Sequence, residues 1–189
     1  MLVGPDGTGK TTVASEMIRQ HGDPSQYLHF RPRISTPPDR KPTDGPPPAQ
    51  KRHSPGPIPV GWLRLGLSLT VFWFGYLRWM RPARRHGTLI IGDRWVYGYV
   101  TQPVALGFGG PSWLARLACQ IAPRPDLVVR LNAPSEVVAA RKSDLTPDEI
   151  TAEDELWETL PQVDLTVDAR LDPTEIAANI LRKLDWQMT

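Results

Sequence analysis

The feature that most constrains this chain is a glycine-rich segment close to its first residue. Residues 4–11 read GPDGTGKT and satisfy the pattern G-x-x-x-x-G-K-[ST] in full. A short apolar run at residues 1–3 precedes the segment, and residues 12–21 follow with apolar side chains at helical spacing. A strand, a glycine turn and a helix in this order predict an α/β fold with the turn at a strand's carboxyl end.

The composition of this segment is suited to binding phosphate. Glycines let successive backbone N–H groups turn toward one centre, and the N-terminus of the following helix adds positive potential. We expect Lys10 to reach the β- and γ-phosphates of a triphosphate, and the Thr11 hydroxyl to bind Mg²⁺. A glycine turn that binds nothing is the alternative. The residues expected to contact the phosphates are Gly4, Gly7, Thr8, Gly9, Lys10, Thr11 and Thr12.

A second candidate site lies where another apolar run ends. Residues 88–92 predict a buried strand, and Asp93 and Arg94 follow it directly. In phosphate-loop proteins a carboxylate at such a strand end helps to hold Mg²⁺, so Thr11 and Asp93 are the expected metal-binding pair. The Arg94 guanidinium could bind an acceptor phosphate through two hydrogen bonds. A charge pair at the edge of a sheet is the alternative interpretation.

The remaining pattern alternates strands with helices. The expected strands are residues 1–3, 26–30, 88–92, 127–131 and 165–168. The expected helices are residues 12–21, 62–80, 113–121 and 173–184, with two more opening at Pro134 and at Thr146. Thr146 begins a capping-box sequence, with Glu149 three residues further on. This alternation predicts a doubly wound, five-stranded parallel sheet of the P-loop NTPase type.

Prolines concentrate between residues 32 and 59, which hold ten of the 21 in the chain. Proline removes a backbone donor and restricts the residue before it, so neither a helix nor a sheet can run through this segment. We therefore expect a long exposed loop. Loops of this length in compact domains are either functional or disordered, and both possibilities stay open.

The stretch from residue 62 to residue 80 is strongly apolar and aromatic. Arg64 and Arg78 leave an uncharged stretch between them that is short for a membrane span. We expect a helix buried against the sheet. Contact with a membrane is the alternative, which the basic residues Arg78, Arg81, Arg84 and Arg85 would assist.

Charge and cysteine content exclude several classes of protein. The net charge is +2, from 22 basic and 20 acidic residues, which argues against a surface that binds nucleic acid. The single cysteine, Cys119, excludes an intramolecular disulfide framework and a cysteine-based zinc site. We expect a cytoplasmic protein without a signal peptide, and a homodimer remains possible.

Two motifs together resemble the thymidylate kinase family of nucleoside monophosphate kinases. They are the sequence GPDGTGKTT at residues 4–12 and Asp93-Arg94-Trp95. Residues 125–131 (PDLVVRL), then Glu136 and Arg141, resemble the family's fourth strand and the helix after it. Residues 167–169 (VDA) resemble its fifth strand. The likeness runs in order along nearly the whole chain, and it is closest to a divergent group of thymidylate kinase-like proteins.

The resemblance implies one P-loop kinase domain over residues 1–189, with a proline-rich insertion at about 32–60 and a lid-like segment at about 141–158. It implies transfer of the γ-phosphoryl group of ATP, with Mg²⁺, to a nucleoside monophosphate. Lys10, Asp93, Arg94 and Arg141 would be catalytic; Asp6, Arg31 and Arg94 would hold the acceptor; Ala169 and Arg170 would lie beside the adenine.

The chain departs from this family on the acceptor side. Its glycine-rich loop holds no arginine, and the fifteen residues after Lys142 contain six carboxylates and no lysine or arginine. Residues 30–33 read FRPR where the family has Arg-Glu-Pro after its second strand. Two alternatives therefore stay open. One is a nucleotide-binding protein with little or no transfer that engages a partner or a membrane surface. The other is a kinase for a sugar or a lipid-linked acceptor.

Overall fold

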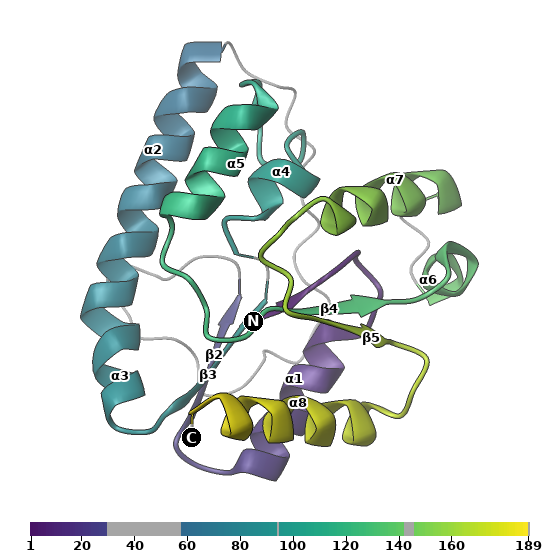
Figure 1. Cartoon of the computed structure of the whole chain (residues 1–189). Coiled ribbons are helices and arrows are strands. Elements are labelled where there is room, and N and C mark those ends of the chain that lie inside the picture. The colour runs from purple at the N-terminus through teal and green to yellow at the C-terminus, as the bar shows by residue number, and fades with distance from the viewer. Residues whose placement is uncertain (30–57, 94, 142–145, 189) are drawn as a thin grey trace.

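A computed structural model describes residues 1–29, 58–93, 95–141 and 146–188 of the chain (Figure 1). Expectations for Arg31, Arg94, residues 142–145 and nearly all of the proline-rich insertion lie outside the described residues. The strands are β1 (Leu2–Val3), β2 (Ser25–His29), β3 (Leu89–Asp93), β4 (Val129–Asn132) and β5 (Leu165–Asp168). The helices are α1 (Lys10–His21), α2 (Ile58–Gly75), a π-helical turn (Tyr76–Met80), α3 (Arg81–Arg85), α4 (Gly98–Thr101), α5 (Ser112–Ile121), α6 (Ser135–Arg141), α7 (Pro147–Glu158) and α8 (Pro173–Met188).

The five strands form one sheet in the order β2-β3-β1-β4-β5, and every pair is parallel. The central strand β1 is only two residues long, and its Leu2 pairs with Asp93 of β3 on one side and Val129 of β4 on the other. The expectation of an α/β fold with a five-stranded parallel sheet is confirmed. Because all strands are parallel, the loops after β1, β3, β4 and β5 leave the same edge of the sheet.

Helices cover both faces of the sheet, as in a doubly wound fold (Figure 1). On one face, Val129 and Leu131 of β4 pack with Val13 of α1 and Ile176 of α8. The other face lies beneath α2, α4, α5 and α7, whose side chains form a second apolar core. Alternate residues of a strand point to opposite faces, so β1 supplies Leu2 to one core and Val3 to the other.

Local signals set most element boundaries. The capping box at Thr146 is confirmed, because its side chain accepts from the Glu149 N–H while the Glu149 carboxylate accepts from the Thr146 N–H. Helix α1 begins at Lys10, two residues before the expected start, because Gly9 ends the loop with a φ of 83°. Helix α4 was not expected, since four residues are too few to show a helical period.

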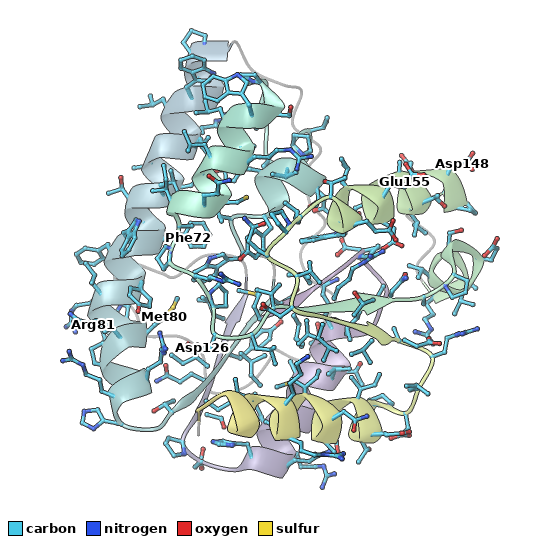
Figure 2. The ribbon with its side chains drawn as sticks, in the orientation of Figure 1. Phe72, Met80, Arg81, Asp126, Asp148 and Glu155 are labelled. Carbon is cyan, nitrogen blue, oxygen red and sulfur yellow. The ribbon has the colours of Figure 1, made fainter. Side chains whose placement is uncertain are left out.

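The apolar helix expected at residues 62–80 continues from Ile58 through the π-helical turn to Arg85, and it is buried on one side only. Phe72 and Met80 face the interior of the molecule, while Arg81 lies on the outer side (Figure 2). The expectation of a helix buried against the sheet is wrong for this outer side, where Leu63 is 73% exposed. The helix is apolar all round, and its neighbours cover only the side that faces them.

Candidate functional site

The loop between β1 and α1 is a compact turn built on three glycines. Gly4, Gly7 and Gly9 have φ values of 128°, 97° and 83°, a conformation that residues with a Cβ rarely adopt. The Thr8 side chain is buried, and its hydroxyl donates a hydrogen bond of 2.9 Å to the carbonyl of Pro5. The loop is therefore closed by its own contacts at the carboxyl edge of the sheet.

Lys10 extends back from the first turn of α1 into this loop. Its ammonium group donates to the carbonyl oxygens of Gly4 and Pro5, at 2.8 and 2.7 Å. The Asp6 carboxylate lies 3.8 Å from the same nitrogen. Lys10 is only 6% exposed. A positive charge is thus held at a defined place in the loop by main-chain acceptors.

The N-terminus of α1 carries no capping side chain. Its N-cap residue is Gly9, no side chain caps it, and its first turn contains no acidic residue. Thr11 and Thr12, in that first turn, are exposed. The first N–H groups of a helix have no partner inside the helix, and they carry the positive end of its dipole. This end of α1 can therefore accept an anion, with Lys10 beside it.

Asp93 lies at the end of β3, beside the start of the loop. It pairs in register with Leu2, two residues before Gly4, and it is 3% exposed. One of its carboxylate oxygens accepts a hydrogen bond of 3.2 Å from the Tyr27 hydroxyl. The register brings this carboxylate and the glycine-rich loop to the same edge of the sheet, as the sequence predicts.

The Thr11 hydroxyl and the Asp93 carboxylate are oxygen donors of the kind that Mg²⁺ prefers. Within the part of the chain that the structure describes, no three His, Cys, Asp or Glu side chains form a cluster that could hold a metal ion. Mg²⁺ at a phosphate-transfer site keeps several waters and uses phosphate oxygens, with one or two protein ligands. A donor pair of this composition fits that ion better than it fits zinc or calcium.

Glu153 of α7 is a site residue that the sequence interpretation missed. It is buried, and its Oε1 accepts hydrogen bonds from Gln102 at 2.9 Å and from the Trp157 indole at 3.3 Å. A signal was present, because Ile150, Glu153 and Trp157 recur at helical spacing and all three are buried. In the sequence, Glu153 is one of six carboxylates in the fifteen residues after Lys142.

The environment of Glu153 connects α7 electrostatically to the glycine-rich loop. Burial raises the pKa of Glu153, and the hydrogen bond from Gln102 opposes this rise. The Lys10 ammonium also lowers this pKa, whereas the Asp6 carboxylate raises it. Both charges of the loop therefore act on the Glu153 carboxyl group.

A second group of expected site residues gathers where β4 and β5 end. Arg141 donates to the carbonyl of Ala169 at 3.5 Å, and the Arg170 guanidinium lies 2.6 Å from the Asp168 carboxylate. Arg170 holds the pKa of Asp168 down to about 2. These contacts bring Arg141, which the family resemblance assigns to the transferring group, to the residues expected at the adenine.

A cavity of about 470 Å³ adjoins this second group, between α7 and the ends of β4 and β5. Asn132, Asp154, Thr166, Asp168 and Arg170 line it, together with part of α6. Its lining therefore includes positively charged, negatively charged and neutral polar side chains. The sequence analysis expects Arg170 beside the adenine but does not predict the cavity, which forms only when α7 packs over the strands.

Comparison with known proteins adds no relative. No protein-family model matches the chain, and no curated protein matches it. The likeness to thymidylate kinases therefore remains a prediction that rests on the motifs themselves.

Proposed function

We propose that the chain is a P-loop kinase that binds ATP and Mg²⁺ at residues 4–11 and transfers the γ-phosphoryl group to a nucleoside monophosphate. The observation that carries this proposal is the position of Lys10. A buried ammonium group, held by the loop's own carbonyls beside the uncapped N-terminus of α1, is suited to an anion such as a triphosphate.

The donor side of the proposed reaction would use groups of α1 and the carboxylate at the end of β3. The first-turn amides of α1 and the Lys10 ammonium would bind phosphate oxygens, and the Thr11 hydroxyl with the Asp93 carboxylate would hold Mg²⁺. When bound, Mg²⁺ neutralises charge on the phosphates. Little covalent work is left to the protein in phosphoryl transfer, so alignment and fixed positive charge are its main contributions.

The acceptor side of the proposal comes from the family resemblance. It assigns Asp6, Arg31 and Arg94 to the acceptor and Arg141 to the transferring group. Arg94→Ala should accordingly raise the KM of the acceptor more than that of ATP. A rise in the KM of ATP alone would show that Arg94 has been assigned to the wrong substrate.

ATP binding to the purified chain is the first test. Isothermal titration calorimetry with MgATP should detect binding, and Lys10→Ala should weaken it by about tenfold or more through loss of a charge at the phosphates. Lys183→Ala, on α8, is the matched control and should bind like the parent. A folded parent that gives no heat with ATP or GTP would contradict the proposal.

Acceptor-dependent release of ADP is the second test. A panel of nucleoside monophosphates, sugars and sugar phosphates is incubated with the protein, ATP and Mg²⁺. Release of ADP that requires one monophosphate, and that Lys10→Ala abolishes, would support the proposed reaction. Release of ADP that requires a sugar instead would support the proposed donor site and identify a sugar as the acceptor.

The charge of α7 favours a second candidate, a nucleotide-binding protein with weak or no transfer. This helix carries six carboxylates and no lysine or arginine, although the resemblance places it in the lid over the phosphates. Like charges oppose a closed lid around a triphosphate. ATP binding that depends on Lys10, with no turnover for any acceptor, would favour this candidate.

A further inference from the structure

The outer side of α2 is an apolar surface of unusual size for a helix that faces solvent. Its large exposed side chains, from 40% to 73% exposed, are Val60, Trp62, Leu63, Leu67, Trp73, Phe74 and Leu77, and we call them the outer face. Scattered exposed apolar residues are ordinary, but a contiguous apolar patch marks an interaction site. Because these residues share one side of a single helix, they form such a patch.

The neighbouring helix α5 carries an apolar stripe of its own. Trp113, Leu117 and Ile121 recur every fourth residue, and each is at least 41% exposed. α5 packs beside α2 in the structure (Figure 1). The flank of the domain formed by these two helices is therefore rich in exposed tryptophan, which favours the boundary between water and lipid, and in aliphatic side chains, which favour hydrocarbon.

This helix is long and apolar enough to cross a membrane, but its packing argues for a position in the membrane plane. Residues Pro59–Arg85 have a mean hydropathy of 1.3 over their most apolar window, of which 28% is buried in the protein. Leu65 and Phe72 belong to the apolar core, and the Ser68 and Tyr99 hydroxyls hydrogen-bond at 2.5 Å. A helix joined to the domain along one whole side cannot be surrounded by lipid, but it can lay its other side on a bilayer.

The helix that carries the outer face has charged side chains of one sign only. Residues 58–92 contain five arginines and no aspartate or glutamate. Four of these arginines follow the apolar stretch, and Arg81 lies on the outer side of the helix (Figure 2). Arg84 instead pairs with Asp126 at 2.5 Å, which fixes α3 against the body of the domain. An apolar face with a basic end matches a surface that combines hydrocarbon with negative charge.

The acidic part of the molecule lies on the opposite flank. α7 is far from α2 in the structure, and its Asp148 and Glu155 are exposed at its outer side (Figures 1 and 2). The charge distribution would therefore orient the domain on an anionic surface, with α2 and α3 toward the surface and α7 away from it.

We propose that the outer face of α2, with the arginines that follow it, binds the surface of an anionic lipid bilayer. A second copy of the chain is a poorer occupant. A two-fold interface places the same patch on both sides, and this patch has positive charge with no negative charge to meet it. The proposal is independent of nucleotide binding at residues 4–11.

Vesicle flotation without nucleotide tests the proposal. The protein should float with vesicles of equimolar phosphatidylcholine and phosphatidylglycerol, bind pure phosphatidylcholine much more weakly, and be released by salt. Leu67→Gln should lower the partition coefficient by roughly tenfold. Arg81→Gln combined with Arg85→Gln should lower it by about thirtyfold, and only on anionic vesicles.

Matched variants test whether vesicle binding depends on this surface or only on exposed apolar residues and net charge in general. Leu171→Gln removes an exposed leucine elsewhere, and Arg19→Gln combined with Arg182→Gln removes the same charge from other exposed sites. Both should float like the parent. Circular dichroism and thermal unfolding establish that each variant is folded.

The proposal would be overturned if the folded protein stays out of the floating fraction with anionic vesicles, or if the parent and all four variants float equally. It would also be overturned if light scattering shows a dimer that Leu67→Gln dissociates, in a protein that does not float. That result would assign the outer face to a second copy of the chain.

Discussion

A Cβ added to Gly4 would lie 2.4 Å from the carbonyl oxygen of Leu131 in β4. The first residue of the glycine-rich loop therefore passes directly against the neighbouring strand. This close approach lets the loop turn away from the very short strand β1 while Lys10 bonds to the Gly4 carbonyl.

Gly4→Ala should destabilise the fold by about 3 kcal/mol, because the backbone φ of 128° disfavours a Cβ and the added carbon collides with main chain. Chemical denaturation measures this loss. Gly87→Ala is the control, since its φ is 71° but a Cβ there meets nothing within 4 Å; backbone strain alone should cost about 1 kcal/mol. Equal losses in both variants would contradict the close approach at Leu131.

Arg130→Ala should cost about 2–3 kcal/mol, because Arg130 is a buried cation that joins β4 to α7. Its Nη2 lies 2.7 Å from the Asp154 carboxylate and 3.3 Å from that of Glu158. Arg124, paired with Asp164, is 68% exposed, so Arg124→Ala should cost less than about 1 kcal/mol. Urea unfolding of the two variants compares a buried with an exposed arginine, and similar losses would argue against the buried bridge.

Ionisation of Glu153 should lower the free energy of unfolding as the pH rises. Burial raises its pKa in the folded protein, so the folded state keeps a proton that the unfolded chain has already released. The unfolded state therefore binds fewer protons between the two pKa values, and the free energy of unfolding decreases across that window. Gln cannot ionise, and its Oε1 can still accept from Gln102 and Trp157. Glu153→Gln should remove this part of the decrease.

The measurement is the free energy of unfolding from about pH 4 to pH 8, a range that begins near the ordinary pKa of glutamate. Glu155→Gln, an exposed change on the same helix, should keep the slope of the parent. If Glu153→Gln also keeps that slope, the carboxyl of Glu153 titrates normally in the folded protein.

Cys119 should react slowly with thiol reagents in the folded protein. Burial raises the pKa of its thiol to about 12, and the sulfur lies 3.9 Å from the Val96 carbonyl. The thiolate is the reactive form, so both its population and its access are low. Since the chain has one cysteine, reaction with Ellman's reagent reports on this residue alone. In denaturant the thiol should react fully. If it also reacts within seconds in native buffer, the site around Cys119 opens readily.

Arg141→Ala should lower kcat by about tenfold or more and change the affinity for ATP little, if the arginine stabilises the transferring group as proposed. To do so, Arg141 must leave the Ala169 carbonyl that it contacts at 3.5 Å. Arg182→Ala, an exposed change on α8, should leave both quantities unchanged. Loss of ATP affinity with kcat preserved would assign Arg141 to the donor instead.

Local patterns predicted the elements that hold the candidate site. The run of glycines with Lys10 and Thr11, and the apolar strand that ends in Asp93, both depend on residues near each other in sequence. Parallel pairing then brings the two strand ends together, as the register of Leu2 with Asp93 shows. Glu153 was missed because its partner Gln102 is 51 residues away, and only the packing of α7 joins them.

The amino-acid sequence by itself determined the alternation of strands and helices, the glycine turn and the caps, because these depend on steric and hydrogen-bonding preferences within a few residues. Only the tertiary structure decided which side of each element is covered. Leu65 and Leu67 are equally apolar and two residues apart, yet the first is 3% exposed and the second 63% exposed. Hydropathy is a property of the residue, whereas burial depends on which distant elements pack against it.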